Sequence, residues 1–320
     1  MKNKVKEFLG IFCLILILGI SFFISLIFGA EKSDSFIILE LRLPRSFLVL
    51  LAGSLLAASG SVFQMFFRNP LAEPGLLGIS SGATLGAVIS ASLGSISFCG
   101  GYFSTVNLFA FLGAFLSGLI LVLISSVTGK KVSSVVLLLC GTALGTLYSS
   151  ISSAFLLMHN KELYGIFTWL LGSFNGRGFD ELKFVLVPGA VSFVRMLFIS
   201  NTLDLLNGGE ENAGFLGVNV KLLRVMVILS GSLAFSFAVC AGGTISFVGL
   251  VAPHIMRKLF SPKSRILIIS SALGGAILLL ITDTLCRVVV RPGELPSGII
   301  TSLIGVPFFL TLIFKKRRVE

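Results

Sequence analysis

The sequence predicts an all-α membrane protein whose helices cross the bilayer about ten times and form one domain over residues 1–320. Of the 320 residues, 55% are hydrophobic and only 12% are charged, and the mean hydropathy is +1.03. A soluble domain carries about 25% charged residues, so this chain cannot cover a water-facing surface. That excludes a soluble or a disordered protein. The apolar stretches are continuous rather than alternating, which favours helices over the strands of a membrane barrel.

The first half of the chain contains four uncharged stretches, at residues 8–29, 46–67, 74–129 and 132–158. One span needs about 20 residues, so the third stretch holds two spans around a polar turn near residues 95–107. The first stretch could also be a signal peptide, but its apolar region is too long. Moreover, Phe28 would stand near the cleavage site, where a small residue is required. We therefore expect a first span that is retained, with the N-terminus inside.

The second half is expected to supply five more spans. They are residues 184–200, which include Arg195, two spans within residues 221–260, and residues 266–282 and 297–314. Residues 221–260 are long for one span and short for two, and a turn at residues 241–244 would divide them. Basic residues cluster at both ends of the chain, and the positive-inside rule then requires an even number of spans. We therefore predict two spans here and both termini in the cytoplasm.

The charged residues indicate orientation rather than chemistry. The balance of 25 Lys and Arg against 14 Asp and Glu gives a net charge of +11, which fits basic membrane loops and does not require nucleic acid. The sequence has no phosphate loop, no paired histidines and no C-x-x-C spacing. We therefore expect no enzyme, no catalytic residue, no metal site and no cofactor. Asp283 stands at the end of a span, and Arg287 four residues later predicts a local ion pair.

Glycines and prolines mark the specific parts of the sequence. Gly82 with Gly86, and Gly141 with Gly145, have the spacing that brings helices close in lipid, and we expect them to pack helices within the bundle. Four segments combine prolines, glycines and charges in specific orders: residues 41–45, 68–82, 247–257 and 294–309. The second of these contains two prolines and three glycines, which predicts non-helical backbone. At membrane depth such backbone is tolerated only where it is buried in protein or lines a cavity.

Four segments of the sequence, taken in order, resemble those of the FecCD-type permeases: RLPR, NPLAEPGLLGISSGA, FVGLVAPHIMR and ELPSGIITSLIGVPFF. These proteins are the membrane subunits of ABC importers for iron-siderophores, haem and cobalamin, and the resemblance extends from residue 42 to the C-terminus. It implies the architecture of a type II ABC importer permease in the cytoplasmic (inner) membrane. It also implies a second permease subunit, identical or a paralogue, two cytoplasmic ATPase subunits, and an extracytoplasmic substrate-binding protein.

The resemblance gives residues 201–220 a role as a cytoplasmic loop that couples to the ATPase. They are similar to a LGEEAARSLGV segment of the family, whose short helices rest in a groove of the ATPase. The residues that match this pattern are Glu210, Glu211, Ala213, Leu216, Gly217 and Val218, and those that depart from it are Gly208, Asn212, Gly214 and Phe215. Two of the departures are glycines, which weaken a helix. The alternative interpretation is a solvated connector.

Four arginines map to the outer side, against the positive-inside trend: Arg42, Arg45, Arg287 and Arg291. The first three match positions where the family has arginines, and Arg291 is an addition of this sequence. The resemblance implies that they form a basic patch that pairs with acidic residues of the binding protein. The alternative is that they extend from the membrane to its interface without a partner.

The resemblance also implies that the fifth and tenth spans line the translocation path. The candidates are small or hydroxylated and carry no charge: Gly141, Gly145, Ser149, Ser152, Ser153, Ser297, Gly298, Thr301 and Ser302. Such a surface would let a bulky ligand slide without holding it. The alternative is that these residues only pack helices together.

The function that these observations predict is ATP-driven import of an iron-siderophore or another iron chelate, with ATP hydrolysed by a separate subunit. A cobalamin importer of the same family is the first alternative. An ion-coupled secondary transporter is the alternative from another class, but it would need a buried ionisable residue at mid-membrane, and Arg195 lies within reach of the interface. A membrane scaffold that transports nothing would leave the broken segments unexplained.

Overall fold

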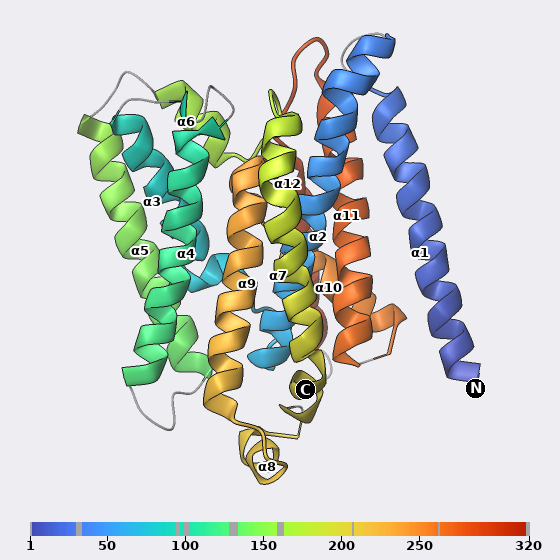
Figure 1. Ribbon diagram of the computed structural model, residues 1–320, viewed down its shortest axis with the longest axis vertical. Helices are drawn as coiled ribbons and strands as arrows, with labels where there is room; N and C mark the ends of the chain where they lie inside the picture. Colours follow the sequence, from blue (N-terminus) through green and yellow to red (C-terminus); the bar gives the residue numbers. More distant parts are fainter. Residues whose placement is uncertain are drawn as a thin grey trace.

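A computed structural model describes residues 2–29, 34–93, 97–98, 103–127, 134–158, 163–206, 208–261 and 263–317. Within them the chain forms a helical bundle and one short antiparallel pair of strands, Ser97–Phe98 (β1) with Phe103–Ser104 (β2) (Figure 1). The helices are α1 (Lys2–Ile27), α2 (Leu43–Phe66), α3 (Ile79–Ser92), α4 (Thr105–Val127), α5 (Ser134–Met158), α6 (Leu163–Leu170), α7 (Phe179–Leu206), α8 (Glu210–Phe215), α9 (Val220–Gly242), α10 (Val248–Leu259), α11 (Ser264–Val289) and α12 (Ser297–Arg317). The predicted all-α fold is confirmed. The polar turn expected near residues 95–107 lies partly outside the described residues.

Seven helices in the described part of the chain are long and apolar enough to cross a membrane: α1, α2, α4, α5, α7, α9 and α11. Helices α3, α10 and α12 complete a set of ten, in agreement with the predicted number. The predicted division of residues 221–260 is confirmed, because α9 ends at Gly242 and α10 begins at Val248. However, the 12 residues of α10 extend only about 18 Å, so α10 crosses part of a bilayer rather than all of it.

Two features of the helices were not predicted. Helix α6 forms in the stretch after the fifth span, where we expected only a polar connection. Helix α7 begins at Phe179 and ends at Leu206, so it is longer at both ends than the predicted span at residues 184–200. Asp180 and Glu181 lie in its first turn, where carboxylates interact favourably with the helix dipole. These charges therefore extend the helix instead of ending it.

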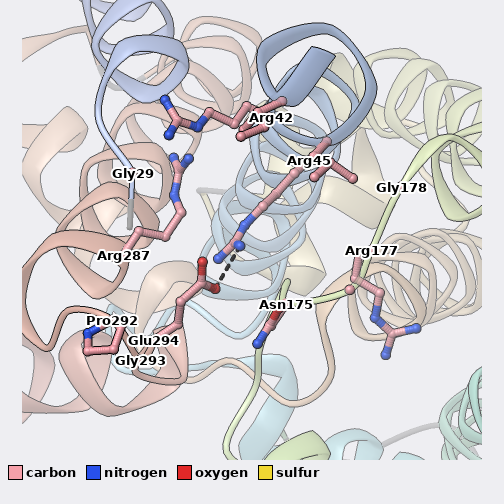
Figure 2. Close-up of a pocket in the computed structure, with 13 residues that line it drawn as sticks. Gly29, Arg42, Arg45, Asn175, Arg177, Gly178, Arg287, Pro292, Gly293 and Glu294 are labelled. Carbon is pink, nitrogen blue, oxygen red and sulfur yellow. Dashed lines mark hydrogen bonds and ion pairs between the residues drawn. The ribbon is translucent and has the colours of Figure 1, made fainter. Parts of the chain in front are cut away.

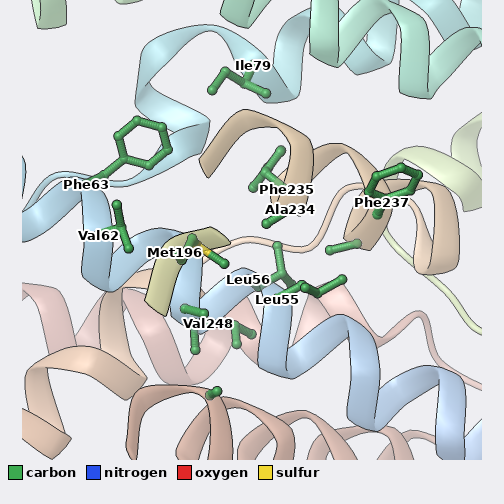
Figure 3. Close-up of a cluster of buried hydrophobic side chains, with 14 of the residues drawn as sticks. Leu55, Leu56, Val62, Phe63, Ile79, Met196, Ala234, Phe235, Phe237 and Val248 are labelled. Atoms are coloured by element: carbon green, nitrogen blue, oxygen red, sulfur yellow. The ribbon is translucent and has the colours of Figure 1, made fainter. Parts of the chain in front are cut away.

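Helices α2, α9 and α11 form the buried centre of the bundle, whereas α1, α5 and α7 expose most of their surface. Figure 3 shows part of this core, where Leu55 and Phe63 of α2 lie near Phe235 of α9 and Met196 of α7, all of them buried. In a lipid environment the exposed apolar side chains of the outer helices face hydrocarbon, so the helices are held together by close packing rather than by exclusion of water.

Glycines bring α2 into backbone contact with two neighbours. A Cβ on Gly53 would lie 2.5 Å from the carbonyl oxygen of Gly275 in α11, and a Cβ on Gly60 would collide with the carbonyl of Gly249 in α10. We call these two contacts the glycine seam of α2. Because any larger side chain would separate the helices, the seam fixes α10 and α11 against α2.

The two glycine pairs expected to pack helices do so. Gly82 and Gly86 of α3 lie against the backbone of α4, and Gly141 of α5 lies against the backbone of Leu77, with no room for a Cβ at any of the three. Gly145 makes an ordinary contact, in which its Cβ would lie 3.4 Å from Ser81 Oγ. Both pairs therefore act inside one chain, as predicted.

The beginning of α1 and the end of α12 lie at the same end of the bundle as α8 (Figure 1). An even number of crossings requires this arrangement. We call this end of the bundle the α8 end, and the other the opposite end. Residues 34–42, which precede α2, and α6 lie toward the opposite end.

Candidate functional site

Two of the four motif segments, residues 68–82 and 294–309, meet the turn that precedes a third at one groove in the bundle, with a volume of about 600 Å³. Ser80 of α3 comes from the second segment, Thr244 and Ser246 precede α10, and α12 supplies one side. The residues that line the groove are Ser80, Leu170, Leu171, Thr244, Ser246, Gly298, Ile299, Ser302, Leu303, Val306 and Pro307. The lining is aliphatic and hydroxylated, and none of these residues carries a charge. A groove of this size suits a ligand as large as many cofactors.

The α2–α3 linker, residues 67–78, leads into the groove through non-helical backbone, as the sequence predicts. Asn69 forms the first turn, because its N–H donates to the carbonyl of Gln64 (3.1 Å) and its side chain accepts the N–H of Leu71 (3.0 Å). A 3₁₀ helix, Pro74–Leu77, follows. Gly78 then has a φ of 76°, which only glycine adopts without strain, and α3 begins at the next residue. Ser117 of α4 donates to the carbonyl of Gly78 (3.0 Å) and holds this turn in place.

The α9–α10 turn and the start of α12 are held together by backbone contacts. Thr244 Oγ1 donates to the carbonyl of Leu170, and the N–H of Gly298 donates to the carbonyl of Gly172 (3.2 Å). A Cβ on Gly298 would collide with the carbonyl of Leu171. The residues at the end of α6 thus fix one end of the groove, so this helix, which was not predicted, helps to position the groove.

The predicted path residues divide into two groups. Of those on α12, Gly298 and Ser302 line the groove, whereas Ser297 and Thr301 are buried and donate to Asp283 Oδ1 (3.2 Å) and to the carbonyl of Gly298 (3.1 Å). The described residues that line the groove include none from α5. On that helix, Ser149 and Ser153 are exposed, and Ser152 is buried and donates to the carbonyl of Tyr148 (2.8 Å). Their place on a path stays a prediction.

Three hydroxyl-bearing residues of the groove were not predicted, Ser80, Thr244 and Ser246. Each lies in or directly before a segment broken by glycine or proline. A search for hydroxyl residues within or next to such breaks, rather than along whole spans, would have found them.

A second pocket, of about 510 Å³, gathers the predicted arginines at the opposite end of the bundle (Figure 2). Arg45 is central, because it donates to both carboxylate oxygens of Asp283 (2.9 and 3.2 Å) and to Glu294 Oε2 (2.8 Å). The predicted ion pair of Asp283 with Arg287 is confirmed, with Nε 3.2 Å from Oδ2. Arg42 Nη1 donates to the carbonyls of Leu26 (3.0 Å) and Ile27 (2.8 Å) at the end of α1.

The arginines are less accessible than an outer basic patch suggests. Arg42, Arg45 and Arg287 are only 5%, 8% and 2% exposed, whereas Arg291 is exposed and does not line this pocket. The physical reason is that a buried charge requires partners: Asp283 and Glu294 supply the counter-charge for Arg45, Asp283 that for Arg287, and backbone carbonyls accept from Arg42. Their role in docking a partner stays a prediction.

At the α8 end, residues 208–220 form a short helix and a defined turn. Gly217 has a φ of 84° and donates to the carbonyl of Gly214 (3.0 Å), while Val218 donates to that of Ala213 (3.0 Å). These two bonds are those of a Schellman motif, which ends helices at a left-handed glycine. Ala213 is buried, so three of the residues that match the family pattern determine the shape of this loop.

One ion pair anchors α8 to the bundle, and its tip is apolar. Glu210 lies 3.4 Å from Arg224, a buried arginine of α9. At the other end of the helix, Phe215 is 89% exposed and Leu216 is 66% exposed. Two large apolar side chains at the tip of a loop outside the spans indicate a surface that another protein covers.

Comparison with known proteins agrees with this geometry. The chain matches the FecCD transport family over residues 8–315. It is 37% identical over 290 residues to the "Probable iron chelatin transport system permease protein" of Helicobacter pylori strain 26695, which covers 90% of this chain and 85% of the relative. It is also 37% identical over 287 residues to the hemin transport system permease protein of Yersinia pestis, which covers 87% of this chain and 83% of the relative.

A solved structure of a metal-chelate type ABC transporter in an inward-facing conformation has the same fold. It superimposes with a TM-score of 0.85 at 32% identity, and the match covers 95% of this chain and 98% of that one. The family match, the relatives and the fold therefore agree. The chain belongs to the FecCD transport family, which consists of multi-pass membrane permeases of ABC importers and not of enzymes.

Proposed function

We propose that this chain is the membrane-spanning permease subunit of an importer that carries an iron chelate across the cytoplasmic membrane. The observation that carries this proposal is the uncharged groove where two broken segments meet the α9–α10 turn, within a chain of the FecCD family. The named relatives favour iron, because they include permeases for iron chelatin and hemin and, in Bacillus subtilis, for Fe(3+)-citrate.

A cobalamin importer is the second candidate, and a specific relative favours it. The cobalamin import system permease protein of Halobacterium salinarum is 36% identical over 296 residues, almost as similar as the iron chelate relatives. The groove itself does not discriminate between the two, because hydroxyl and aliphatic side chains bind neither ligand through charge. Selection between chelates is then a task of the substrate-binding protein.

A second permease subunit, identical or a paralogue, would complete the path. Helix α5 presents the hydroxyls of Ser149 and Ser153 on its exposed surface. Hydroxyls on a lipid-facing surface gain nothing from hydrocarbon, whereas against a second subunit they would face a polar path. We therefore assign Ser149 and Ser153 of α5 to the path between two subunits.

Two cytoplasmic ATPase subunits would supply the energy, since the chain has no phosphate loop. The surface that fits them is the loop at residues 201–220, which carries Glu210, Glu211, Ala213, Leu216, Gly217 and Val218 and is part of the single permease domain of residues 1–320. The exposed tip at Phe215 and Leu216 supports this assignment. With this assignment, the α8 end and both termini would lie in the cytoplasm.

An extracytoplasmic binding protein would dock at the opposite end. Arg42, Arg45 and Arg287 line the pocket there, and Arg291 lies exposed on the following loop. Acidic side chains of a partner would approach Arg291 first. They would reach Arg45 and Arg287 only by sharing or displacing their internal partners, Asp283 and Glu294, and Arg42 only by competing with the carbonyls at the end of α1.

Uptake in proteoliposomes tests the proposed function. The chain is reconstituted with its ATPase and binding protein, and uptake of a ferric hydroxamate siderophore, haemin and cyanocobalamin is measured with and without ATP. We expect uptake of an iron chelate that requires ATP and ceases when the ATPase is inactivated. Uptake that persists with an inactive ATPase would instead indicate an ion-coupled secondary transporter.

A further inference from the structure

Two non-glycine residues in the described part of the chain have a left-handed backbone, Arg68 (φ 49°) and Phe247 (φ 68°). A bulky residue adopts this conformation only when its surroundings hold it there, at a cost of about 1–3 kcal/mol. Such strain gathers at functional sites. Arg68 begins the α2–α3 linker, which leads to Ser80, and Phe247 directly follows Ser246, so each strained residue lies in a stretch of chain that continues to a residue of the groove.

Phe247 is held on three sides. Its N–H donates to Glu73 Oε1 (3.0 Å), and its carbonyl accepts the N–H groups of Leu250 (3.1 Å) and Val251 (2.8 Å), which begin α10. Its ring occupies the space beside Gly305 of α12, where a Cβ would collide with it. One residue therefore joins the linker, α10 and α12.

Glu73 is the part of the linker that reaches this residue. Its backbone is extended (φ −134°, ψ 143°) and it caps the 3₁₀ helix that follows. Its Oε1 would lie 3.7 Å from a Cβ on Gly249, so the carboxyl group stands at the first turn of α10. The N–H groups of a first turn have no partner within the helix, and a carboxylate there is favoured by the helix dipole.

The other end of the linker lies beside the coupling loop. Arg68 Nη1 would be 3.9 Å from a Cβ on Gly209, the residue that caps the start of α8. The linker leads into α3 at the groove, where Ser80, Ser246 and Ser302 are among the lining residues. A continuous stretch of chain thus extends from α8 to the groove, and Glu73 fastens its middle to α10.

We propose that Glu73 is a positioning residue for transport, because its contact with Phe247 transmits a displacement of the α8 loop to the α12 side of the groove. This inference rests on the proposed function. When the ATPases move α8, the linker would move with it through Arg68, and Glu73 would carry Phe247 and the facing segment of α12. Without the contact, ATP hydrolysis would continue, but the α12 side of the groove would no longer move with the α8 loop.

The test measures chelate taken up per ATP hydrolysed in proteoliposomes that hold the complete complex, with the chelate that the wild-type complex transports. Glu73→Ala removes the acceptor, and we expect this ratio to fall about fivefold, the factor supplied by one hydrogen bond of typical net strength. Glu73→Gln keeps an oxygen that can accept the N–H of Phe247. We expect it to retain the wild-type ratio.

Glu181→Ala is the matched control. Glu181 also accepts a backbone N–H at the start of a helix, that of Gly178 at α7 (3.0 Å), but it lies away from both the linker and the groove. We expect an unchanged ratio. An unchanged ratio in Glu73→Ala would overturn the inference, as would a fall of equal size in Glu73→Gln or in the control.

If Glu73→Ala does not assemble with its partners, Gly305→Ala tests the same contact from α12, because the added Cβ displaces the ring of Phe247. A wild-type ratio in that variant would also overturn the inference. The proposed function fails separately, namely if the wild-type complex takes up none of the three chelates with ATP. If chelate uptake stays coupled to ATP hydrolysis in both the wild type and Glu73→Ala, only the role proposed for Glu73 is overturned.

Discussion

Arg45 of α2 and Asp283 of α11 are 238 positions apart in the sequence and form a buried ion pair with two hydrogen bonds, of 2.9 and 3.2 Å. Glu294, in the loop before α12, binds the same guanidinium at 2.8 Å. The pair therefore joins α2, α11 and the entrance to α12 at the end of the bundle where a binding protein is expected to dock.

Removal of Asp283 should destabilise the protein strongly. Asp283→Ala leaves Arg45 and Arg287 buried without their shared counter-charge, and breaking a buried pair in this way costs roughly 3–5 kcal/mol. We expect a clear fall in the melting temperature in detergent. Glu294→Gln, which leaves the Arg45–Asp283 pair intact, should lower it much less. Equal melting of Asp283→Ala and the wild type would show that the pair does not hold these helices together.

Docking of the binding protein is best tested at Arg291. Because this side chain is exposed, Arg291→Glu should leave the fold intact, weaken capture of the binding protein and reduce its dependence on salt. Reversal of Arg42 and Arg45 together should also weaken capture, but Arg45→Glu would place a third carboxylate beside Asp283 and Glu294 and lower the melting temperature. Binding assays at two salt concentrations, combined with melting curves, separate these effects. Unchanged affinity in Arg291→Glu would exclude a role for that residue in docking.

The tip of α8 should contribute to ATPase assembly through Phe215. Burial of a large apolar side chain supplies about 1.5–3 kcal/mol, so Phe215→Ser should weaken assembly roughly 10- to 100-fold. Phe198 of α7 is similarly exposed but lies within a span, so Phe198→Ser should leave assembly unchanged. Binding of the ATPase to the detergent-solubilised permease measures both. Equal affinities of wild type and Phe215→Ser would show that α8 meets its partner through other residues.

The groove should be obstructed by a large side chain at Ser302. Ser302→Phe is expected to reduce chelate uptake about tenfold, equivalent to about 1.4 kcal/mol of added barrier, while ATP hydrolysis by the complex continues. Val194→Phe, on the exposed surface of α7, is the control and should transport normally. Normal uptake by Ser302→Phe would place the path elsewhere in the molecule.

Local pattern allowed most of the fold to be predicted. Spans follow from uncharged length, and the break at residues 68–82 follows from its prolines and glycines. The Asp283–Arg287 pair was predictable because its members are four residues apart on one helix. Helix α6 was missed because it follows a charged segment.

Other features of the site depend on contacts between distant segments. No local pattern shows that Arg45 meets Asp283 or that Glu73 meets Phe247, since each pair comes together only when the bundle forms. The same limit explains why the arginines were expected on the surface: their charge is visible in the sequence, but their counter-charges are identified only by the fold.

The glycine seam of α2 restricts how this molecule can move. Where backbones touch, helices cannot slide past one another without a collision of carbonyl groups, so α2, α10 and α11 are expected to shift together as one rigid body. Any change in the width of the groove must then come from the parts that line it outside this body: α3 at Ser80, the turn before α10, the residues at the end of α6, and α12. Distance measurements between spin labels on α2 and α12 would therefore be more informative than any pair placed within the rigid body.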